Sequence, residues 1–291
     1  MKHVHAPYIP MTTVLTPVLA NHNAHPRDEH IVFHEEGHSY DILCDPDNTY
    51  ISVTTFIHMH FDKFDSDSAV QAVVNGRGWK EGHKYWGMSG DEMKAMWEEM
   101  RDSAAQAGTA LHYAIECFHN RPALPYPYTY AQLLEEHCPR PADQFKVEWN
   151  YFLKFVADHP HFKPYRTEWT IYDEETKIAG SIDMVFENED GSLSIYDWKR
   201  SKEIKQAGYK NKMAISPAIS HLPDANFWHY TLQLNFYKYI LETHYGKKVR
   251  DLCLVRLHPN ALSYEVLPLP LMDREVTDLM RVRMTQLPIK V

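Results

Sequence analysis

Apolar side chains recur at helical spacing in three stretches of the chain. Residues 66–119 are predicted to be helical, with Gly108 as a break and a second helix starting near Thr109 that places Leu111, Ile115 and Phe118 on one side. Residues 143–158 form an amphipathic pattern whose inward side chains are Phe145, Trp149, Phe152 and Phe155. Residues 226–245 predict one long helix.

Runs of alternating and β-branched residues predict strands elsewhere. Two strands are expected within 31–57, with the turn-forming residues Asp45 to Asn48 between them. Arg166 to Tyr172, Ile178 to Phe186 and Leu193 to Trp198 predict three further strands, and 249–257 a last one.

This order of elements predicts an α/β fold in one domain, residues 31–291. Residues 1–30 begin with a stretch rich in Pro, His and Asn and are expected to form an irregular arm. Residues 120–143 hold five prolines and are expected to connect two helices.

Composition restricts the class of protein. Hydrophobic residues make up 44% of the 291 residues and charged residues 24%, which is ordinary for a globular protein. No apolar run is long enough for a membrane-spanning helix. The apolar N-terminal part is interrupted by Pro10 and Pro17, so no secretory signal is expected. We expect an intracellular protein with no membrane partner; its compartment stays open.

Cysteine and histidine spacing argues against several metal centres. The cysteines lie apart, without a CxxC pair, which disfavours disulfides, a zinc ribbon and an iron–sulfur cluster: Cys44, Cys117, Cys138 and Cys253. The 19 histidines contain no HExxH motif.

The formal charge is -9, yet residues 199–212 read KRSKEIKQAGYKNK. This window holds six basic residues and one glutamate. It fits either a phosphate-binding patch or a solvated surface stretch.

The segment GSIDMVFENEDGSLSIYDWK, residues 180–199, carries the chemistry. Asp190-Gly191 predicts a hairpin turn, which places Asp183 opposite residue 196, 197 or 198. Asp197 and Lys199 are two apart and share a face. Close carboxylates repel unless a cation lies between them, and oxygen ligands of this kind suit Mg²⁺.

An Asp, a hairpin and then Asp-X-Lys resemble the motif of the PD-(D/E)XK nuclease superfamily. The stretches IDMVF and SIYDWKRSK are similar to sequences of its RecB-type branch and of mitochondrial genome maintenance exonucleases. Three further stretches resemble that branch in the same order: Ser52-Val53-Thr54-Thr55, Gly108-Thr109-Ala110-Leu111-His112 and Gln233-Leu234-Asn235-Phe236-Tyr237.

The resemblance implies a restriction-endonuclease-like core, a small mixed central sheet flanked by helices. It implies that Asp183, Asp197, His112 and the carbonyl of Trp198 bind metal. Lys199 would orient the attacking water, and Glu168 would bind a second metal or its water. Gln233 and Tyr237 would contact the substrate strand. Lys202 and Arg200 of the basic window are the further candidates for substrate contact.

The resemblance further implies a Mg²⁺-dependent deoxyribonuclease, with Mn²⁺ as a substitute, and exonuclease action on single strands or ends in DNA replication, repair or recombination. DNA and replication or repair proteins are the expected partners. The four cysteines of cluster-bearing relatives and a Walker A motif are missing, so no iron–sulfur cluster is expected and a helicase would be a separate chain.

Structural and non-catalytic alternatives stay open at this point. His112 and Glu168 also fit structural roles, and Tyr237 also fits a helix core. For the whole chain, a non-catalytic nucleic-acid-binding module and an RNA endonuclease are the competing functions.

Overall fold

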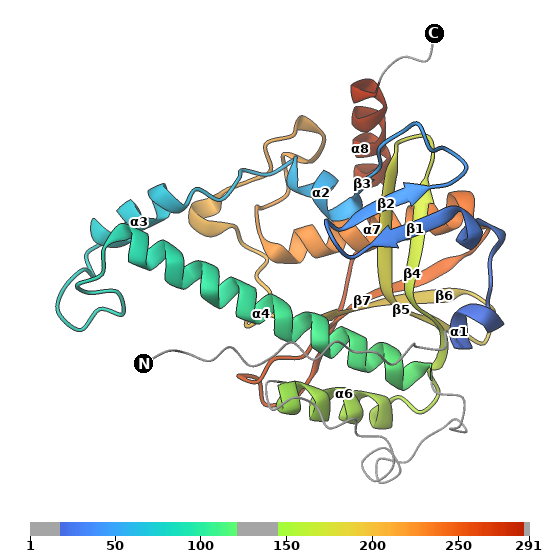
Figure 1. The fold of residues 1–291 in the computed structure, drawn as a ribbon, viewed down its shortest axis with the longest axis horizontal. Coiled ribbons are helices and arrows are strands. Elements are labelled where there is room, and N and C mark those ends of the chain that lie inside the picture. Colours follow the sequence, from blue (N-terminus) through green and yellow to red (C-terminus); the bar gives the residue numbers. More distant parts are fainter. Residues whose placement is uncertain (1–17, 121–144, 288–291) are drawn as a thin grey trace.

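The computed structural model describes residues 18–120 and 145–287 (Figure 1). The strands are β1 (Ile31–His34), β2 (Ser39–Ile42), β3 (Ile51–Ser52), β4 (Lys163–Asp173), β5 (Ile178–Glu187), β6 (Leu193–Lys199), β7 (Val249–Arg256) and β8 (Glu265–Pro268). The α-helices are α1 (Val18–His22), α2 (Val53–His58), α3 (Ser66–Val74), α4 (Gly90–His119), α6 (Lys146–Asp158), α7 (Asn226–His244) and α8 (Asp273–Gln286). Short 3-10 helices are η1 (Pro26–His30), η3 (Tyr209–Asn211) and η4 (Pro217–Ile219).

A mixed six-stranded sheet forms the centre, and β1 and β2 form a separate hairpin. Strand β5 pairs antiparallel with β4 and β6 and parallel with β3. Strand β6 pairs parallel with β7, which pairs antiparallel with β8. This mixed sheet flanked by helices confirms the predicted fold class.

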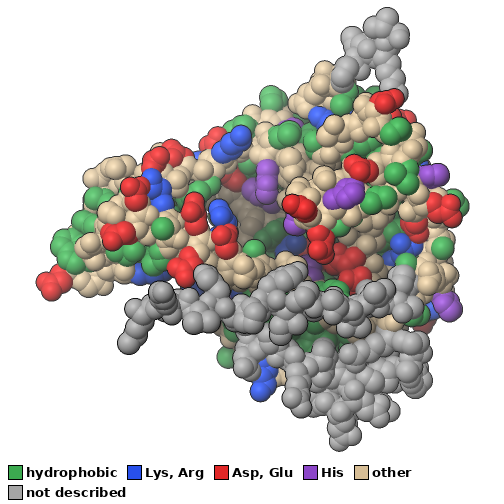
Figure 2. Space-filling model, in the orientation of Figure 1, with side chains coloured by type: hydrophobic (Ala, Val, Ile, Leu, Met, Phe, Trp, Pro, Cys, Tyr) green, Lys and Arg blue, Asp and Glu red, His purple; other side chains and the backbone are tan. Residues whose placement is uncertain are grey.

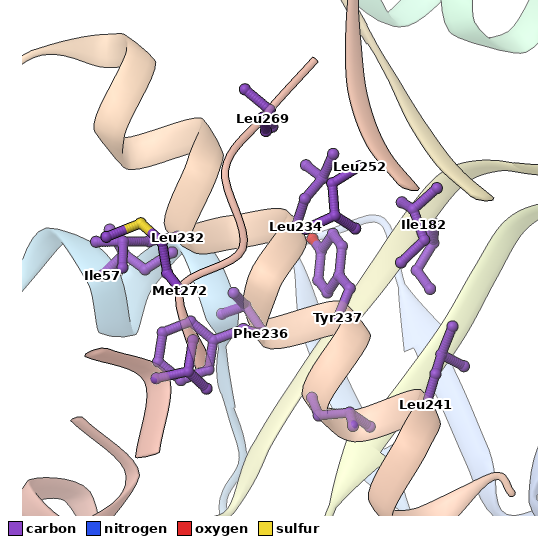
Figure 3. Close-up of a cluster of buried hydrophobic side chains, with 14 of the residues drawn as sticks. Ile57, Ile182, Leu232, Leu234, Phe236, Tyr237, Leu241, Leu252, Leu269 and Met272 are labelled. Carbon is purple, nitrogen blue, oxygen red and sulfur yellow. The ribbon is translucent and has the colours of Figure 1, made fainter. Parts of the chain in front are cut away.

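Helices cover both faces of the sheet (Figure 1). Helices α2, α7 and α8 bury apolar side chains against one face, and Figure 3 shows Ile57, Leu232, Leu252 and Met272 from this core. Helices α4 and α6 cover the other face with a core that contains Trp149, Phe152 and Trp198. Helix α3 and the start of α4 project away from the sheet (Figure 1).

Along one edge of β5, residues 180–183 lie between the stretches that pair with β3 and with β6. This opening in the pairing positions the site. Strand β4 pairs along the whole of one edge of β5. Strands β3 and β6 therefore both pair with the opposite edge. Strand β3 pairs with Ile178 and Ala179, whereas β6 begins pairing at Met184. Ile182 and Met184 also belong to cores on opposite faces, although residues two apart in a regular strand share a face. The alternation of β5 is therefore interrupted at Asp183.

Two sequence predictions for the N-terminal half are wrong. Gly108 does not end a helix, because α4 is continuous through it; a long amphipathic face outweighs the low helix propensity of one glycine. The second strand expected within 31–57 is also wrong over most of its length, because only Ile51–Ser52 is strand and Val53–His58 is helix; the predicted turn at 45–48 is present. The hairpin partners are β1 and β2, and the SVTT stretch ends β3 and begins α2, where Ser52 Oγ accepts a hydrogen bond from the Thr55 amide at 2.9 Å.

The predicted arm is structured over residues 18–30, which contain α1 and η1. The carboxylate of Asp28 accepts hydrogen bonds from Arg166 at 2.7 Å and from the Trp169 indole at 2.9 Å. Arg27 forms an ion pair with Glu174 at 2.7 Å. These contacts tie the segment to β4. Residues 1–17 and nearly all of the predicted 120–143 connector lie outside the described residues.

Among the helices of the described part of the chain, none is both long and apolar enough to cross a membrane.

Candidate metal centre and its surroundings

Three carboxylates line up across three neighbouring strands. Strands β4 and β5 pair on both sides of Glu168 and Asp183, so these two lie opposite each other. The pairing of β5 with β6 runs to Met184 and Tyr196, and one step further Asp183 lies opposite Asp197. The predicted hairpin juxtaposition of Asp183 and Asp197 is confirmed.

His112 reaches this row from helix α4. Its Nδ1 lies 3.4 Å from the Asp183 carboxylate and 3.9 Å from that of Glu168. Its Nε2 lies 2.9 Å from the carbonyl oxygen of Trp198. The Trp198 amide donates a hydrogen bond to the Asp183 carboxylate at 3.0 Å, where the β5–β6 ladder opens. One helix and three strands thus converge on a single point.

Lys199 lies beside the acids on the same face of β6 as Asp197. Its ammonium is 2.5 Å from the Asp197 carboxylate and 4.6 Å from the ring centre of Tyr230 on α7. Burial acts to lower the pKa of Lys199, but Asp197 and Asp183 outweigh it and raise that pKa above its usual value. The side chain is therefore an ammonium and presents a positive charge.

Glu168 is held in an unfavourable backbone conformation. Its φ is 43°, a left-handed value that costs a non-glycine residue about 1–3 kcal/mol. Ser181 Oγ donates a hydrogen bond to the Glu168 carboxylate at 3.1 Å. The Ser181 bond helps to hold this carboxylate, which lies 3.9 Å from Nδ1 of His112.

The acids carry uncompensated negative charge. Burial and the neighbouring Asp183 together raise the pKa of Asp197 to about 6, although Lys199 acts to lower it. Burial, Asp183 and Glu116 raise the pKa of Glu168 well above its usual range. Among the described residues, neither oxygen of Asp197 has a hydrogen-bond partner of good geometry, despite the nearby Lys199 ammonium. A cation would offset this repulsion.

The donor atoms fit a divalent cation. Ligand atoms of His112, Glu168 and Asp183 all lie within 4.8 Å of one another. One imidazole nitrogen with carboxylate and carbonyl oxygens suits Mg²⁺ or Mn²⁺. The Trp198 carbonyl lies next to His112, as its predicted role requires. Asp197 lies outside this three-residue group and pairs with Lys199, so its metal role stays a prediction.

The structure places the predicted substrate contacts differently. Tyr237 is 3% exposed and lies in the core among Leu234, Leu252 and Ile182 (Figure 3). A Cβ on Gly180 would be 2.6 Å from its ring, so the ring packs directly on Gly180 of β5. The hydroxyl of Tyr237 accepts a hydrogen bond from Gln233 at 2.9 Å. Tyr237 thus orients Gln233, and only Gln233 has exposed surface with which to meet a ligand.

The two basic residues after Lys199 also differ from each other. Arg200 forms an ion pair at 2.7 Å with Glu148 of α6, whose side chain is 2% exposed. This pair occupies one side of its guanidinium. Lys202 is exposed and free to meet a phosphate.

A hollow of about 290 Å³ opens next to the centre, and the basic side of the centre faces it. It lies between α4 and the end of β6, and its lining includes Ala104, Gly108, His112, Lys199 and Tyr230. In the view of Figure 2, the surface is hollowed near the centre of the molecule, and histidine, acidic and basic side chains lie at the rim of the hollow.

Sequence reasoning missed three residues of this region. Ser181 orients Glu168, Tyr230 contacts Lys199, and Glu148 pairs with Arg200. Ser181 lies two residues before Asp183, and Tyr230 lies one helical turn before Gln233, so strand and helix periodicity could have indicated both. No comparable signal in the sequence joins Glu148 to Arg200.

Comparison with solved structures gives partial likenesses. One is the crystal structure of SSO0001, with 15% identity, TM-score 0.27, and coverage of 64% of this chain and 88% of that one. Another is the crystal structure named "Putative exonuclease" from Eubacterium rectale, with 12% identity, TM-score 0.37, and coverage of 81% and 77%. At these TM-scores neither supports an argument about function. No curated protein matches the chain.

The comparison with protein families is decisive. The model of the PD-(D/E)XK nuclease superfamily matches residues 88–282, more than half of the 291 residues, and this range holds every side chain of the centre described above. The chain belongs to the PD-(D/E)XK nuclease superfamily.

Proposed function

We propose that the chain is a divalent-metal-dependent DNA nuclease that hydrolyses phosphodiester bonds. The observation that carries this proposal is the convergence of His112, Glu168 and Asp183 within 4.8 Å, with the Lys199 ammonium alongside. Membership of the superfamily supports nuclease chemistry.

Each residue has a defined part in the proposed reaction. His112, Glu168, Asp183 and the Trp198 carbonyl would hold the ion, which when bound supplies Lewis acidity and a more acidic water. Lys199, as an ammonium, donates hydrogen bonds to the attacking water or to the phosphate, and its charge offsets charge that develops on the phosphate. Asp197 keeps Lys199 protonated and oriented.

We further propose that the enzyme is an exonuclease acting on single strands or free ends, in replication, repair or recombination, alongside proteins of those processes. The hollow beside the centre and the exposed Lys202 support a bound strand with unpaired nucleotides. Either Mg²⁺ or Mn²⁺ would serve.

The test is cleavage of labelled single-stranded DNA, double-stranded DNA and RNA by wild type, Lys199→Ala and Lys248→Ala, with Mg²⁺, Mn²⁺ or EDTA. We expect metal-dependent DNA cleavage, a loss of about 10²–10³-fold in Lys199→Ala, the range found for one preorganised transition-state donor, and full activity in Lys248→Ala. Lys248 is an exposed lysine at the start of β7, at the other end of the sheet.

Several outcomes would contradict the proposal. Cleavage of RNA alone would change the substrate, and binding of DNA without cleavage would indicate a non-catalytic module. Undiminished cleavage by Lys199→Ala would mean that the active site lies elsewhere in the protein. A circular single strand tests end dependence, because a strict exonuclease leaves it intact.

A further inference from the structure

A second hollow, of about 410 Å³, continues from the one beside the metal centre. The two share the lining residue Ser201, so they lie next to each other; we call the pair, with residues 201–209 along it, the track. The second hollow is lined by Lys202, Lys205, Tyr209 and Asn226, among others. Both volumes lie in the range of sites that hold small ligands or parts of larger ones.

The loop that forms this track is exposed and irregular, yet many hydrogen bonds fix it. Arg256 donates to the Lys202 carbonyl at 2.9 Å. Asn226 accepts from the Lys205 amide at 2.8 Å and donates to the Glu203 carbonyl at 2.9 Å. The Trp228 indole donates to the Gln206 carbonyl at 2.9 Å. Such a loop is preorganised for binding, because little conformational entropy remains to be lost.

The loop presents Tyr209 to solvent. Gly208 has no room for a side chain, since a Cβ there would collide with the Lys212 carbonyl. Lys210 and Asn211 have φ values of 52° and 59°, a strained left-handed pair. This tight turn leaves the Tyr209 side chain 69% exposed. A large aromatic ring held outward by strained backbone is a surface for stacking.

Charge along the track favours a polyanion. Lys202 and Lys205 line it, and Lys199 stands at its inner end. Glu203 forms an exposed ion pair with Lys205 at 3.1 Å, a contact that holds Lys205 only weakly. The Asp224 carboxylate also lines the second hollow and lies 3.1 Å from a ring nitrogen of His229. The lysines therefore remain available for phosphates.

We propose that residues 201–209 form a subsite for an unpaired nucleotide of the substrate strand, adjacent to the one that enters the metal centre. A base stacks on Tyr209, and the phosphates flanking it contact Lys202 and Lys205. This inference rests on the proposed function and deepens it. Stacking requires an unpaired base, because a base in a duplex has both faces covered by its neighbours.

Binding tests the stacking part without cleavage. The probe is a fluorescein-labelled oligodeoxythymidylate, or an oligouridylate of the same length, measured by anisotropy in EDTA. Tyr209→Ala should weaken binding about 5- to 10-fold, the lower part of the range for one base on one aromatic ring. Tyr209→Phe should bind like wild type, because the ring and not the hydroxyl carries the contact.

An abasic scan locates the nucleotide. Removing the base at one particular position should weaken binding by wild type as much as Tyr209→Ala does. The two changes together should cost no more than either alone, because they remove the same contact. The DNA and RNA probes show whether the subsite reads the sugar.

Salt dependence tests the phosphate part. Replacing Lys202 and Lys205 together by Ala should reduce the slope of log affinity against log salt by about 1.4, since each single-strand phosphate contact contributes about 0.7. The matched control replaces Lys247 and Lys248, which precede β7 at the far end of the sheet. It should leave the slope unchanged.

Failure here is distinguishable from failure of the proposed function. Wild type that cleaves DNA, while the Tyr209 and lysine variants bind like wild type, would overturn the subsite alone. Wild type that neither cleaves nor binds either strand would overturn both. An equal loss in Tyr209→Phe and Tyr209→Ala would overturn stacking as the mode of binding.

Discussion

Asp197 shows how one buried carboxylate depends on its surroundings. It is 1% exposed, pairs with Lys199 and stands next to Asp183. Its pKa of about 6 lies above the ordinary 3.8, so its effect on folding has a definite sign. A carboxyl group with a raised pKa favours the folded state while protonated and opposes it once ionised.

The first prediction follows from that sign. In EDTA, the contribution of Asp197 to stability is fully present below about pH 4 and is lost as pH rises through about 6, a change of roughly 3 kcal/mol. Asp197→Asn should flatten this part of the pH dependence in urea unfolding. The exposed Asp47→Asn serves as control, and an unchanged pH profile in Asp197→Asn would contradict the assignment.

The second prediction concerns metal binding by His112. Mg²⁺ or Mn²⁺ should raise the melting temperature, because an ion that binds only the folded state at a hundred times its Kd adds about 2.7 kcal/mol. His112→Ala should remove most of this rise, and the exposed His30→Ala should keep it. Differential scanning fluorimetry over a metal titration measures both. An equal rise in all three proteins would place the ion elsewhere.

At the scale of elements, the sequence predicted several helices and strands of the central domain. Strands β5 and β6 and helix α7 were predicted closely, because each is a mostly apolar run that is buried along nearly its whole length. The juxtaposition of Asp183 and Asp197 followed from the hairpin turn. Strand β8 and helix α8 were not predicted; α8 has a polar surface with few buried side chains, and so gives a weak pattern.

The edge of β5 could not be predicted from the sequence. Its opening depends on where β3 and β6 pair, and the core position of Tyr237 depends on Gly180, distant in the chain. The left-handed backbone of Glu168 is likewise imposed by neighbouring strands, since no local residue preference favours it there. Non-local contacts decided these features.

The third prediction tests the packing of Tyr237 on Gly180. Gly180→Ala should cost about 1–3 kcal/mol in urea unfolding, because the added methyl group would press on the Tyr237 ring. Combining it with Tyr237→Leu should reduce that cost. Gly108→Ala is the matched control: nothing lies within 4 Å of its Cβ, and a helix interior favours Ala by up to about 1 kcal/mol. Equal destabilisation at both glycines would argue against close packing at Gly180.

At the scale of the molecule, the chain combines a charge of -9 with basic residues gathered along one track. Under the proposed function, the acidic remainder would limit non-specific attraction of nucleic acid, and the track would select where a strand enters. The N-terminal segment, expected as an arm, belongs to the folded body through Asp28.

The fourth prediction concerns this attachment. Asp28→Ala should lower the free energy of unfolding by about 3 kcal/mol, because it leaves the buried Arg166 guanidinium without its carboxylate. The exposed neighbour Glu29→Ala should change it little. Urea unfolding followed by tryptophan fluorescence reports the difference through Trp169. Similar stability of the two variants would mean that the segment is not part of the cooperative unit.

The left-handed backbone of Glu168 has a consequence for engineering. Glycine at this position would relax φ without strain and would remove one of the mutually repelling acids. Under the proposed function, Glu168→Gly would stabilise the protein while removing a carboxylate proposed to hold the metal ion. A screen for heat tolerance alone would enrich such inactive variants, and a directed-evolution scheme for this chain has to select for turnover in every round.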